Sequence, residues 1–476
     1  MENCIYTLDD LRHNLDPGYI DFTRHNYISQ FDNDFEKRLQ LALQRNYYEK
    51  DSKSEARSSL SRSESFVSIA TDAETISDNY QATWRYPRSN MFRLGAAFLG
   101  FFVGGLKDSA TGVVLPQIEQ YYHISYFTVS LAFLAPFLGS LLAASINDKA
   151  HRLIGRLGVV ILGACLQLSY FITASIAPPF PLFVLSYSAA GLGSGIIEGS
   201  WNAFGGTLEN SNQILGLLHG FYGIGGVVSP SVGQLMIGKG LPWNRVYLLL
   251  VGCSVTSLVC SSIAFRHDRS ARYMNEIANK DGSKNKNSFL TVIKSRLVWI
   301  LAFTIFLYVG GEVSTGGWTT TYMIKVRDGN PDTMGYVSTG YWIGIALGRI
   351  VLGFVSAKIG HLQILIIVYL VGVISAALCF WLIPNIIAAA ISIGVVGLLV
   401  GPLFPTMVAV SVTKLPKWLH VSGLGFAAAF GGGGAAVIPF VAGALSDSFG
   451  PWAIAPLIVG AFSGNLLLWL VIVKFF

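Results

Sequence analysis

Charged residues are scarce in this amino-acid sequence. Of its 476 residues, 13% are Asp, Glu, Lys or Arg, 52% are hydrophobic, and the mean hydropathy is +0.52. A soluble globular domain usually carries about 25% charged residues. The shortage of charge therefore excludes an ordinary soluble domain and indicates a protein that crosses a membrane several times.

Cysteines are few, and the motifs of catalysis are absent. The five cysteines show neither metal-ligand spacing nor a disulfide framework: Cys4, Cys165, Cys253, Cys260 and Cys379. The sequence contains no Walker motif and no nucleophile triad, which argues against ATP-driven transport and against an enzyme. We accordingly expect no catalytic residues, no cofactor, no metal and no nucleic-acid partner.

The net charge of +6 hides two regions of opposite sign. Residues 1–89 contain 11 Lys or Arg and 15 Asp or Glu, whereas residues 90–476 contain 22 and 12. The first region lacks a long apolar run, and its Ser-rich stretch 52–79 is poor in residues that form a core. This composition is typical of disorder, so we predict a disordered cytosolic tail over residues 1–89.

From Phe92 onward, apolar segments of about twenty residues follow one another, and each is long enough to cross a hydrocarbon core of about 30 Å. We place twelve of them near residues 92–116, 125–146, 156–177, 180–205, 212–238, 245–265, 297–323, 333–357, 362–383, 386–411, 419–445 and 451–473. A basic cytosolic linker, residues 266–296, separates the sixth from the seventh. The predicted fold is an all-helical membrane domain of two six-helix bundles, residues 90–265 and 297–476.

Basic residues beside the spans predict the orientation of the chain. With the N-terminus inside, the inner loops hold the six Lys or Arg of residues 266–287 and also Lys149, Arg152, Arg156, Lys358, Lys414 and Lys417. The outer loops hold Lys239, Arg245, Lys325 and Arg327. Because cytosolic loops carry an excess of Lys and Arg, we expect both termini in the cytosol, and we favour the plasma membrane over an internal one.

The two halves echo each other in sequence. The stretch FVGGLKDSATG (102–112) has a counterpart in YVGGEVSTGGW (308–318). Similarly, GGVVSPSVG (225–233) corresponds by position to GGAAVIPFVAG (433–443). Many secondary transporters consist of two repeated halves and bind their substrate at the membrane midplane between them.

Two loop motifs extend this pattern. The stretches NDKAHRLIGR (147–156) and GRIVLGFVSAKIGH (348–361) are similar to the loops that follow the second and eighth helices in the major facilitator superfamily. The chain therefore resembles that superfamily over residues 90–476. The resemblance implies a gating role for Asp148, Arg156 and Arg349.

Glu198 interrupts an apolar span, where an ionised side chain costs about 2.5–3.5 kcal/mol. It could bind a proton and substrate in a central cavity, or it could be a structural carboxylate paired with a neighbouring helix. Removal from water disfavours the charged form of a carboxyl group, which suits proton binding. Asn202 and Trp201 share its helix face and could bind the hydroxyl groups and the ring face of a sugar.

Within the superfamily, GLGSGIIEGSWNAFGG (191–206) is similar to the fourth helix of the fucose:proton symporter group, and fungal relatives of unassigned substrate resemble the whole chain most. The resemblance places Glu198 on the group's acidic position and Asn202 on its asparagine. It also matches Asp108 to a second carboxylate. Two polar positions of the group's fifth helix hold His219 and Tyr222 here.

Several of these residues have two readings. Asp108 could titrate or could pair with Lys107. Glu312 occupies the repeat position in the seventh span, and its face could line a cavity or could be packing with a polar seam; that face continues with Thr315, Trp318 and Tyr322. His219 titrates near neutral pH, although a lone membrane histidine is more often a hydrogen-bonded packing residue.

We predict a secondary transporter, a monomer in the lipid bilayer, that moves a small polar solute such as a sugar together with protons by alternating access. Sodium is an alternative coupling ion. A proton-coupled antiporter is a second reading, because GGVVSPSVG (225–233) resembles the glycine–proline motif of antiporters. The long Ser-rich tail motivates a third, a nutrient sensor with a transporter fold.

Overall fold

The computed structural model describes residues 83–85, 88–268, 292, 294–416 and 420–476. The chain divides into two compact units, Met1–Arg88 and Ser89–Phe476. The helices of the membrane domain all belong to the second unit. Most of the predicted tail and most of the predicted linker lie outside the described residues.

All regular secondary structure of the described residues is helical, and a helix suits a membrane because its backbone hydrogen bonds are satisfied internally. The first half contains α4 (Ser89–Tyr122), α5 (Tyr126–Ser175), α6 (Phe180–Gly206), α7 (Ser211–Gly238), η3 (Trp243–Arg245) and α8 (Val246–Ala264). The second half contains α11 (Arg296–Lys325), α12 (Gly335–Leu347), η5 (Gly348–Leu352), α13 (Gly353–Ile359), α14 (Leu362–Leu382), α15 (Ile386–Val400), α16 (Leu403–Lys414), α17 (His420–Phe449), η7 (Pro451–Ala453) and α18 (Ile454–Phe475).

The longest helix, α5, holds two of the twelve predicted spans. In the described part of the chain, eleven helices are long and apolar enough to cross a membrane, and α5 is one of them with 50 residues. A straight helix of that length would measure about 75 Å, far more than a bilayer core. The backbone instead breaks at Gly155, where φ is 67° and ψ is 179°, so that α5 consists of two successive helices. With α5 counted as two, the described residues therefore contain twelve spans, as predicted.

Two predicted boundaries in this half are wrong. Residues 147–154, predicted to be a loop, are helical, and an ion pair of 2.9 Å between Arg152 and Asp148 at i,i+4 spacing stabilises their turn. The first span continues through Pro116, the predicted end, to Tyr122. A proline inside a helix removes one backbone hydrogen bond, but membrane helices tolerate it where neighbouring helices pack around it, and Ile118 in the following turn is fully buried.

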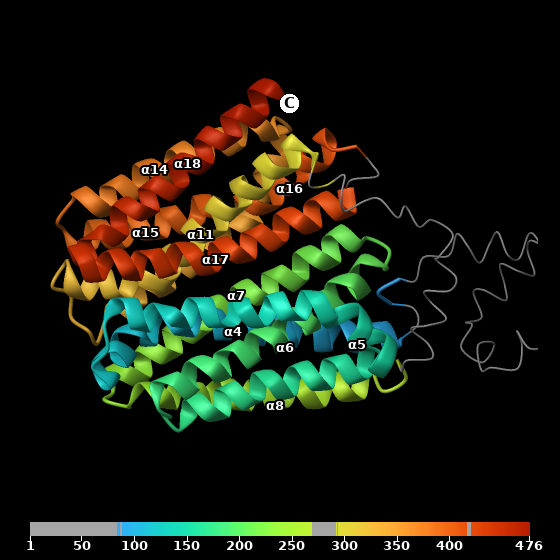
Figure 1. The fold of residues 1–476 in the computed structure, drawn as a ribbon. Helices are drawn as coiled ribbons and strands as arrows, with labels where there is room; N and C mark the ends of the chain where they lie inside the picture. The colour runs from blue at the N-terminus through green and yellow to red at the C-terminus, as the bar shows by residue number, and fades with distance from the viewer. Residues whose placement is uncertain (1–82, 86–87, 269–291, 293, 417–419) are drawn as a thin grey trace, which may run out of the picture. The chain divides into compact units, whose positions relative to one another are not determined.

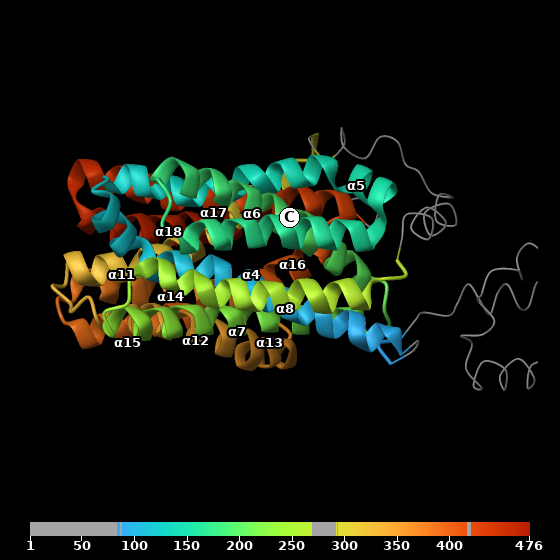
Figure 2. The same cartoon turned by 90° about the horizontal axis from the view of Figure 1, so that it is seen from below.

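The helices form two groups that face each other along the domain, α4–α8 and α11–α18 (Figures 1 and 2). Across the divide α7 packs on α12, α5 on α17 and α4 on α11. At the crossing of α4 and α11, Gly112 lies against the carbonyl of Gly316 and leaves no room for a methyl group. The two repeated sequence stretches thus meet where the two halves are in contact.

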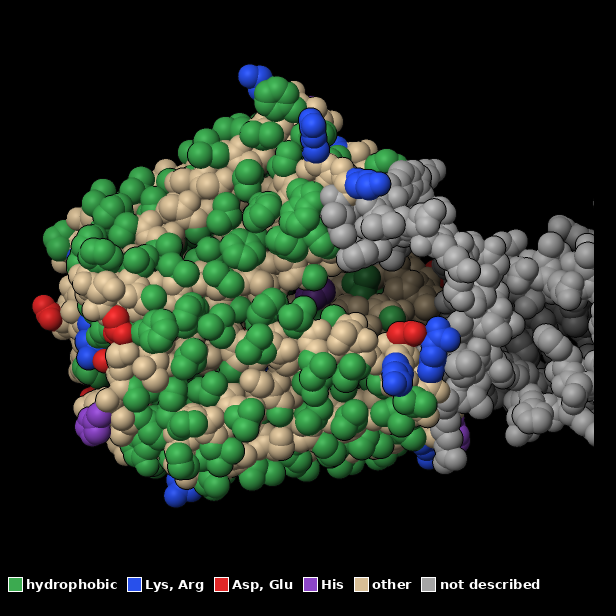
Figure 3. All heavy atoms as spheres, viewed as in Figure 1, with side chains coloured by type: hydrophobic (Ala, Val, Ile, Leu, Met, Phe, Trp, Pro, Cys, Tyr) green, Lys and Arg blue, Asp and Glu red, His purple; other side chains and the backbone are tan. Residues whose placement is uncertain are grey.

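On the face in Figure 3, hydrophobic side chains are spread over the membrane domain and charged side chains are few. Large apolar side chains are exposed on helices of both halves, among them Leu142, Ile263, Phe354, Ile387 and Leu467. A surface of this kind suits lipid, and the protein is a multi-pass membrane protein. We call the end at which α4 begins and α8 ends the linker end. The opposite end, at which α4 ends and α5 begins, is the far end.

Candidate transport site

Close packing fixes the position of α6 in the first half. Gly191 of α6 lies against the carbonyl of Pro136 on α5, without room for a methyl group. Further along α6, the ring of Trp201 packs on Gly100 of α4 and is 3% exposed. The ring of Trp201 therefore belongs to the helix packing in this conformation. This packing also fixes the position of Glu198, three residues earlier on the same helix, relative to α4.

Glu198 faces α4 and α7. A methyl group at Gly104 of α4 would lie 3.4 Å from Glu198 Oε1 and 3.6 Å from the ring of Tyr222 on α7. The Glu198 side chain is partly exposed, and no described residue forms a hydrogen bond or an ion pair with its carboxylate. Ionisable groups in a membrane are normally paired or face a water-filled space. Glu198 thus lies at the edge of an accessible space.

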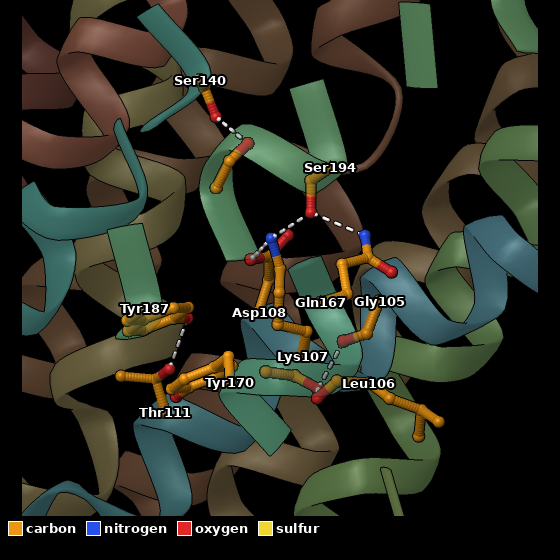
Figure 4. A network of polar contacts seen from close by, with 12 residues as sticks. Gly105, Leu106, Lys107, Asp108, Thr111, Ser140, Gln167, Tyr170, Tyr187 and Ser194 are labelled. Atoms are coloured by element: carbon orange, nitrogen blue, oxygen red, sulfur yellow. Dashed lines mark hydrogen bonds and ion pairs between the residues drawn. The ribbon is translucent and has the colours of Figure 1, made fainter. Parts of the chain in front are cut away.

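Lys107 and Asp108 of α4 form the polar centre of the first half (Figure 4). Lys107 Nζ lies 3.1 Å from Asp108 Oδ1 and donates a hydrogen bond of 2.8 Å to Ser194 Oγ on α6. Gln167 of α5 donates to the same Ser194 oxygen at 2.9 Å, and Tyr222 OH donates to Asp108 Oδ2 at 2.9 Å. The Lys107 side chain is 5% exposed and that of Asp108 36%. The carboxylate of Asp108 therefore has two donors and access to open space.

An aromatic layer bounds this cluster on the side of the far end. Thr111 Oγ1 and Tyr187 OH share a hydrogen bond of 2.9 Å, one helical turn beyond Lys107 (Figure 4). The ring of Tyr187 stacks on that of Tyr170, with centroids 4.3 Å apart, and Tyr170 OH donates to Tyr247 OH at 3.1 Å. All three tyrosines are buried, so the layer separates the cluster from the far end.

In the second half, Glu312 of α11 pairs with Arg349. Glu312 Oε1 lies 3.1 Å from Arg349 Nη2, and Tyr341 OH donates to the Glu312 carbonyl at 2.8 Å. Arg349 lies in the π-helical turn η5, which interrupts the eighth span. Single π-turns inside helices occur frequently at functional sites. The first half therefore carries the ion pair Lys107–Asp108, and the second half carries Arg349–Glu312.

The rest of the predicted polar face of α11 belongs to packing. Thr315 donates to the Gly311 carbonyl of its own helix at 2.7 Å. Trp318 is fully buried and donates to the carbonyl of Pro439 on α17 at 2.9 Å. Tyr322 packs on the ring of Phe380, with centroids 4.5 Å apart. Thr315, Trp318 and Tyr322 are therefore packing residues in this conformation.

The other predicted residues are distributed between the site and the linker end. Asn202 is partly exposed, and the His219 side chain is exposed and meets the ring of Phe101 edge-on at 5.3 Å. Neither side chain has a hydrogen-bond partner among the described residues. Asp148 pairs with a residue of its own helix, as described above, and Arg156 follows the break in α5, partly buried.

Comparison with known proteins identifies the family. The sequence profile of the Major Facilitator Superfamily matches residues 97–330 and 326–476. The chain belongs to this superfamily.

Relatives and solved structures agree with that assignment. The superfamily member is 28% identical over 387 residues to "Bypass of stop codon protein 6" of Saccharomyces cerevisiae, covering 75% of this chain and 77% of that one. It is 22% identical over 277 residues to a "Protein TsgA homolog" of Buchnera aphidicola, covering 56% and 68%. The crystal structure of the E. coli fucose:proton symporter FucP has the same fold, with a TM-score of 0.56, 15% identity and coverage of 79% and 97%.

Superfamily transporters expose their site to one side at a time, so the contacts between the halves define the conformation. At the far end, Glu119 Oε1 of α4 lies 3.5 Å from Lys325 Nζ of α11. Asp447 near the end of α17 accepts hydrogen bonds of 2.8 and 3.0 Å from the backbone amides of Tyr126 and Phe127. These amides open α5, so a carboxylate of the second half caps a helix of the first.

A glutamine adds a further contact between the halves at the far end. Gln234 of α7 accepts a hydrogen bond of 2.8 Å from the Gly335 amide and donates one of 3.0 Å to the Pro331 carbonyl. These hydrogen bonds and the ion pair, which join described residues of the two halves, all lie at the far end. The face in Figure 3 is hollowed between the halves toward the linker end. In this conformation, the two halves are therefore closed against each other at the far end.

Asp447→Ala is expected to shift this conformational balance. Loss of a helix cap costs about 0.5–2 kcal/mol, and about 1.4 kcal/mol corresponds to a tenfold change in a population ratio. Because the cap forms only when the halves meet, the far-end-open fraction should rise roughly tenfold. Distances between spin labels at the exposed positions Lys239 and Asp328, in a chain without its native cysteines, measure that fraction.

Ser125→Ala is the matched control for this prediction. Ser125 Oγ accepts from the Thr128 amide at 3.2 Å and so caps the same helix, but within one half. Its loss should weaken α5 equally in both conformations and leave the label distances unchanged. Equal responses of the two variants would show that the Asp447 contact does not control closure.

Proposed function

We propose that this superfamily member couples the movement of a small polar solute, a sugar or a similarly hydroxylated compound, to the movement of protons. Glu198 is the observation that carries the proposal. It is a carboxylate in the middle of a membrane span, partly exposed and without an ion-pair partner among the described residues. Such a group can bind a proton at one membrane face and release it at the other.

The surroundings of Glu198 fit a polyhydroxylated solute. Asn202, one helical turn further on α6, offers an amide without a partner among the described residues. Asp108 is accessible on α4, and Tyr222 supplies a phenol ring and a hydroxyl group on α7. Amides and carboxylates can bind sugar hydroxyl groups, and an aromatic ring can pack on a sugar's apolar face. The likeness in fold to a fucose:proton symporter is consistent with this solute class.

Proton binding is proposed to bias alternating access. In the conformation described here, the site is closed toward the far end by the contacts of Asp447, Glu119 and Gln234. A proton on Glu198 removes a charge from the site and so changes the relative free energy of the two conformations. A tenfold proton gradient supplies about 1.4 kcal/mol, which suffices for tenfold accumulation of solute.

Uptake by the full chain in proteoliposomes tests the proposal. A panel of radiolabelled hexoses, polyols and small acids is offered under an imposed pH gradient, an imposed sodium gradient or neither. Accumulation of a hydroxylated solute down the proton gradient is expected. Solute movement opposite to the proton flux identifies an antiporter. Accumulation that requires the sodium gradient shows that sodium is the coupling ion. Solute binding without any flux favours a sensor.

We further propose that the linker end faces the cytosol, which would make the described conformation inward-open. The excess of Lys and Arg beside that end supports this orientation. An epitope tag at residue 1 or 476 should then react with antibody only after the plasma membrane is permeabilised. Labelling of intact cells at either terminus would reverse the orientation.

A further inference from the structure

One cation and two carboxylates meet in the first half. Lys107 and Asp108 lie on α4, one turn after Gly104, and Glu198 Oε1 lies against Gly104 at 3.4 Å from the position of a methyl group there. On α6, Ser194 holds the Lys107 ammonium at 2.8 Å and lies one turn before Glu198. The Lys107 ammonium is therefore anchored about one helical turn from Glu198 while it contacts Asp108 directly.

The partners of the three groups are unequal. Asp108 keeps a second donor, the hydroxyl of Tyr222 at 2.9 Å, whether or not Lys107 stays beside it. Glu198 has no such donor among the described residues. The lysine has three donors on a flexible stem of four carbons. It can thus leave Asp108 hydrogen-bonded and turn toward Glu198.

Other charged and titratable groups of the neighbouring elements are occupied or neutral. Glu312 of α11 and Arg349 of η5 pair with each other at 3.1 Å. The tyrosines of α5 and α6, Tyr170 and Tyr187, face the cluster from its far-end side as neutral phenols. His219 of α7 packs against Phe101. Arg93, about four helical turns earlier on α4, pairs with Asp268 at 2.9 Å. Among the described residues, Lys107 is therefore the cation available to Asp108 and Glu198.

We propose that Lys107 is a counter-ion shared by Asp108 and Glu198. It pairs with Asp108 while Glu198 carries a proton, and it turns to Glu198 when that proton leaves. One cation and two carboxylates are neutral with a single proton bound, so the cluster takes up one proton in each cycle. This role rests on the proposed proton coupling. In that coupling, Lys107 is a positioning residue that acts through the two carboxylates.

The pH dependence of Glu198 labelling tests the sharing directly. N,N′-dicyclohexylcarbodiimide reacts with protonated carboxyl groups in apolar surroundings, and mass spectrometry of purified full-length protein measures the labelled fraction at each pH. An opposite charge within about 4–6 Å shifts a carboxyl titration by about 1–3 pH units. Lys107→Gln should therefore raise the labelling midpoint by about one pH unit, whereas Lys107→Arg should keep it.

Asp108→Asn supplies the discriminating background. If Asp108 competes for the lysine, its removal leaves Lys107 wholly to Glu198, and Lys107→Gln should then raise the midpoint by about two units or more. Two independent charges would instead give the same Lys107→Gln shift in the parent and in the Asp108→Asn background. Equal shifts, or no shift, overturn the proposal. Lys239→Gln, which changes an exposed lysine outside the cluster, should leave the midpoint where it is.

Two features keep the test decisive. Lys107→Gln leaves Asp108 without its cation and so endangers folding. Lys107→Arg keeps the positive charge, and Lys107→Gln combined with Asp108→Asn removes both charges of the pair, so both variants avoid that cost. The labelling needs no solute. A chain that transports nothing but shows the unequal shifts therefore refutes the proposed function and retains the shared counter-ion.

Discussion

Replacement of Glu198 by Gln is expected to abolish proton-driven accumulation of the solute while exchange of solute between the two sides continues. Glutamine has the shape and the neutral charge of the protonated side chain, but it cannot release a proton. Under a tenfold proton gradient, the parent should accumulate solute about tenfold, whereas the variant should only equilibrate it. Net uptake and counterflow in the same proteoliposomes separate the two activities.

Glu209→Gln is the matched control, because Glu209 is exposed between α6 and α7. It should accumulate solute like the parent. Asn202→Ala should behave differently from both, since a lost hydrogen bond of about 1 kcal/mol raises the half-saturation concentration several-fold without uncoupling. Normal accumulation by Glu198→Gln would make Glu198 a structural carboxylate and would direct attention to Asp108 or Glu312.

The fold follows from local properties of the sequence. Apolar runs of membrane length predict helices because no other open structure satisfies its backbone inside a bilayer. The helix ends depend on finer features. The break in α5 lies at Gly155, which alone in that polar stretch adopts a positive φ, and the preceding residues stay helical. The position of this turn is therefore better predicted by the backbone freedom of glycine than by the polar composition of the stretch around it.

The site could be predicted only in part. Glu198 is evident from sequence because a carboxylate in an apolar span is costly wherever its neighbours lie. Lys107 carries the same signal, but the sequence suggests it only as a partner of the adjacent Asp108. Its contact with Ser194 joins residues 87 positions apart. That contact depends on how α6 packs on α4, which local sequence does not specify.

Helix periodicity has a similar limit on α11. Spacing of three residues suggests one face for Glu312, Thr315 and Trp318, but Glu312 contacts η5 whereas Trp318 contacts α17. What covers each part of the face is decided by residues far away in sequence. The Pro439 carbonyl, 121 positions later, accepts the indole hydrogen bond of Trp318, while Arg349 reaches Glu312. The predicted face therefore divides between an ion pair with one neighbouring helix and packing against another.

Breaking that ion pair should have a large effect on stability. Arg349→Gln leaves Glu312 without its cation in a membrane span, where the two side chains are 21% and 10% exposed. Removal of one partner of a buried ion pair costs about 3–5 kcal/mol. We expect a large fall in the melting temperature of the purified protein in detergent, measured by intrinsic fluorescence.

Arg152→Gln is the control for this variant, because it breaks a helix-surface pair with Asp148 whose side chains are 44% and 67% exposed. Exposed pairs at this spacing contribute about 0.3–0.5 kcal/mol, so its melting temperature should hardly change. The neutral double variant Arg349→Gln with Glu312→Gln should recover most of the loss, since no uncompensated charge is left. Equal stability of Arg349→Gln and the parent would mean that Glu312 is satisfied by water in the open space between the halves. In that case Glu312 could itself bind a proton, and the second half would contribute to coupling.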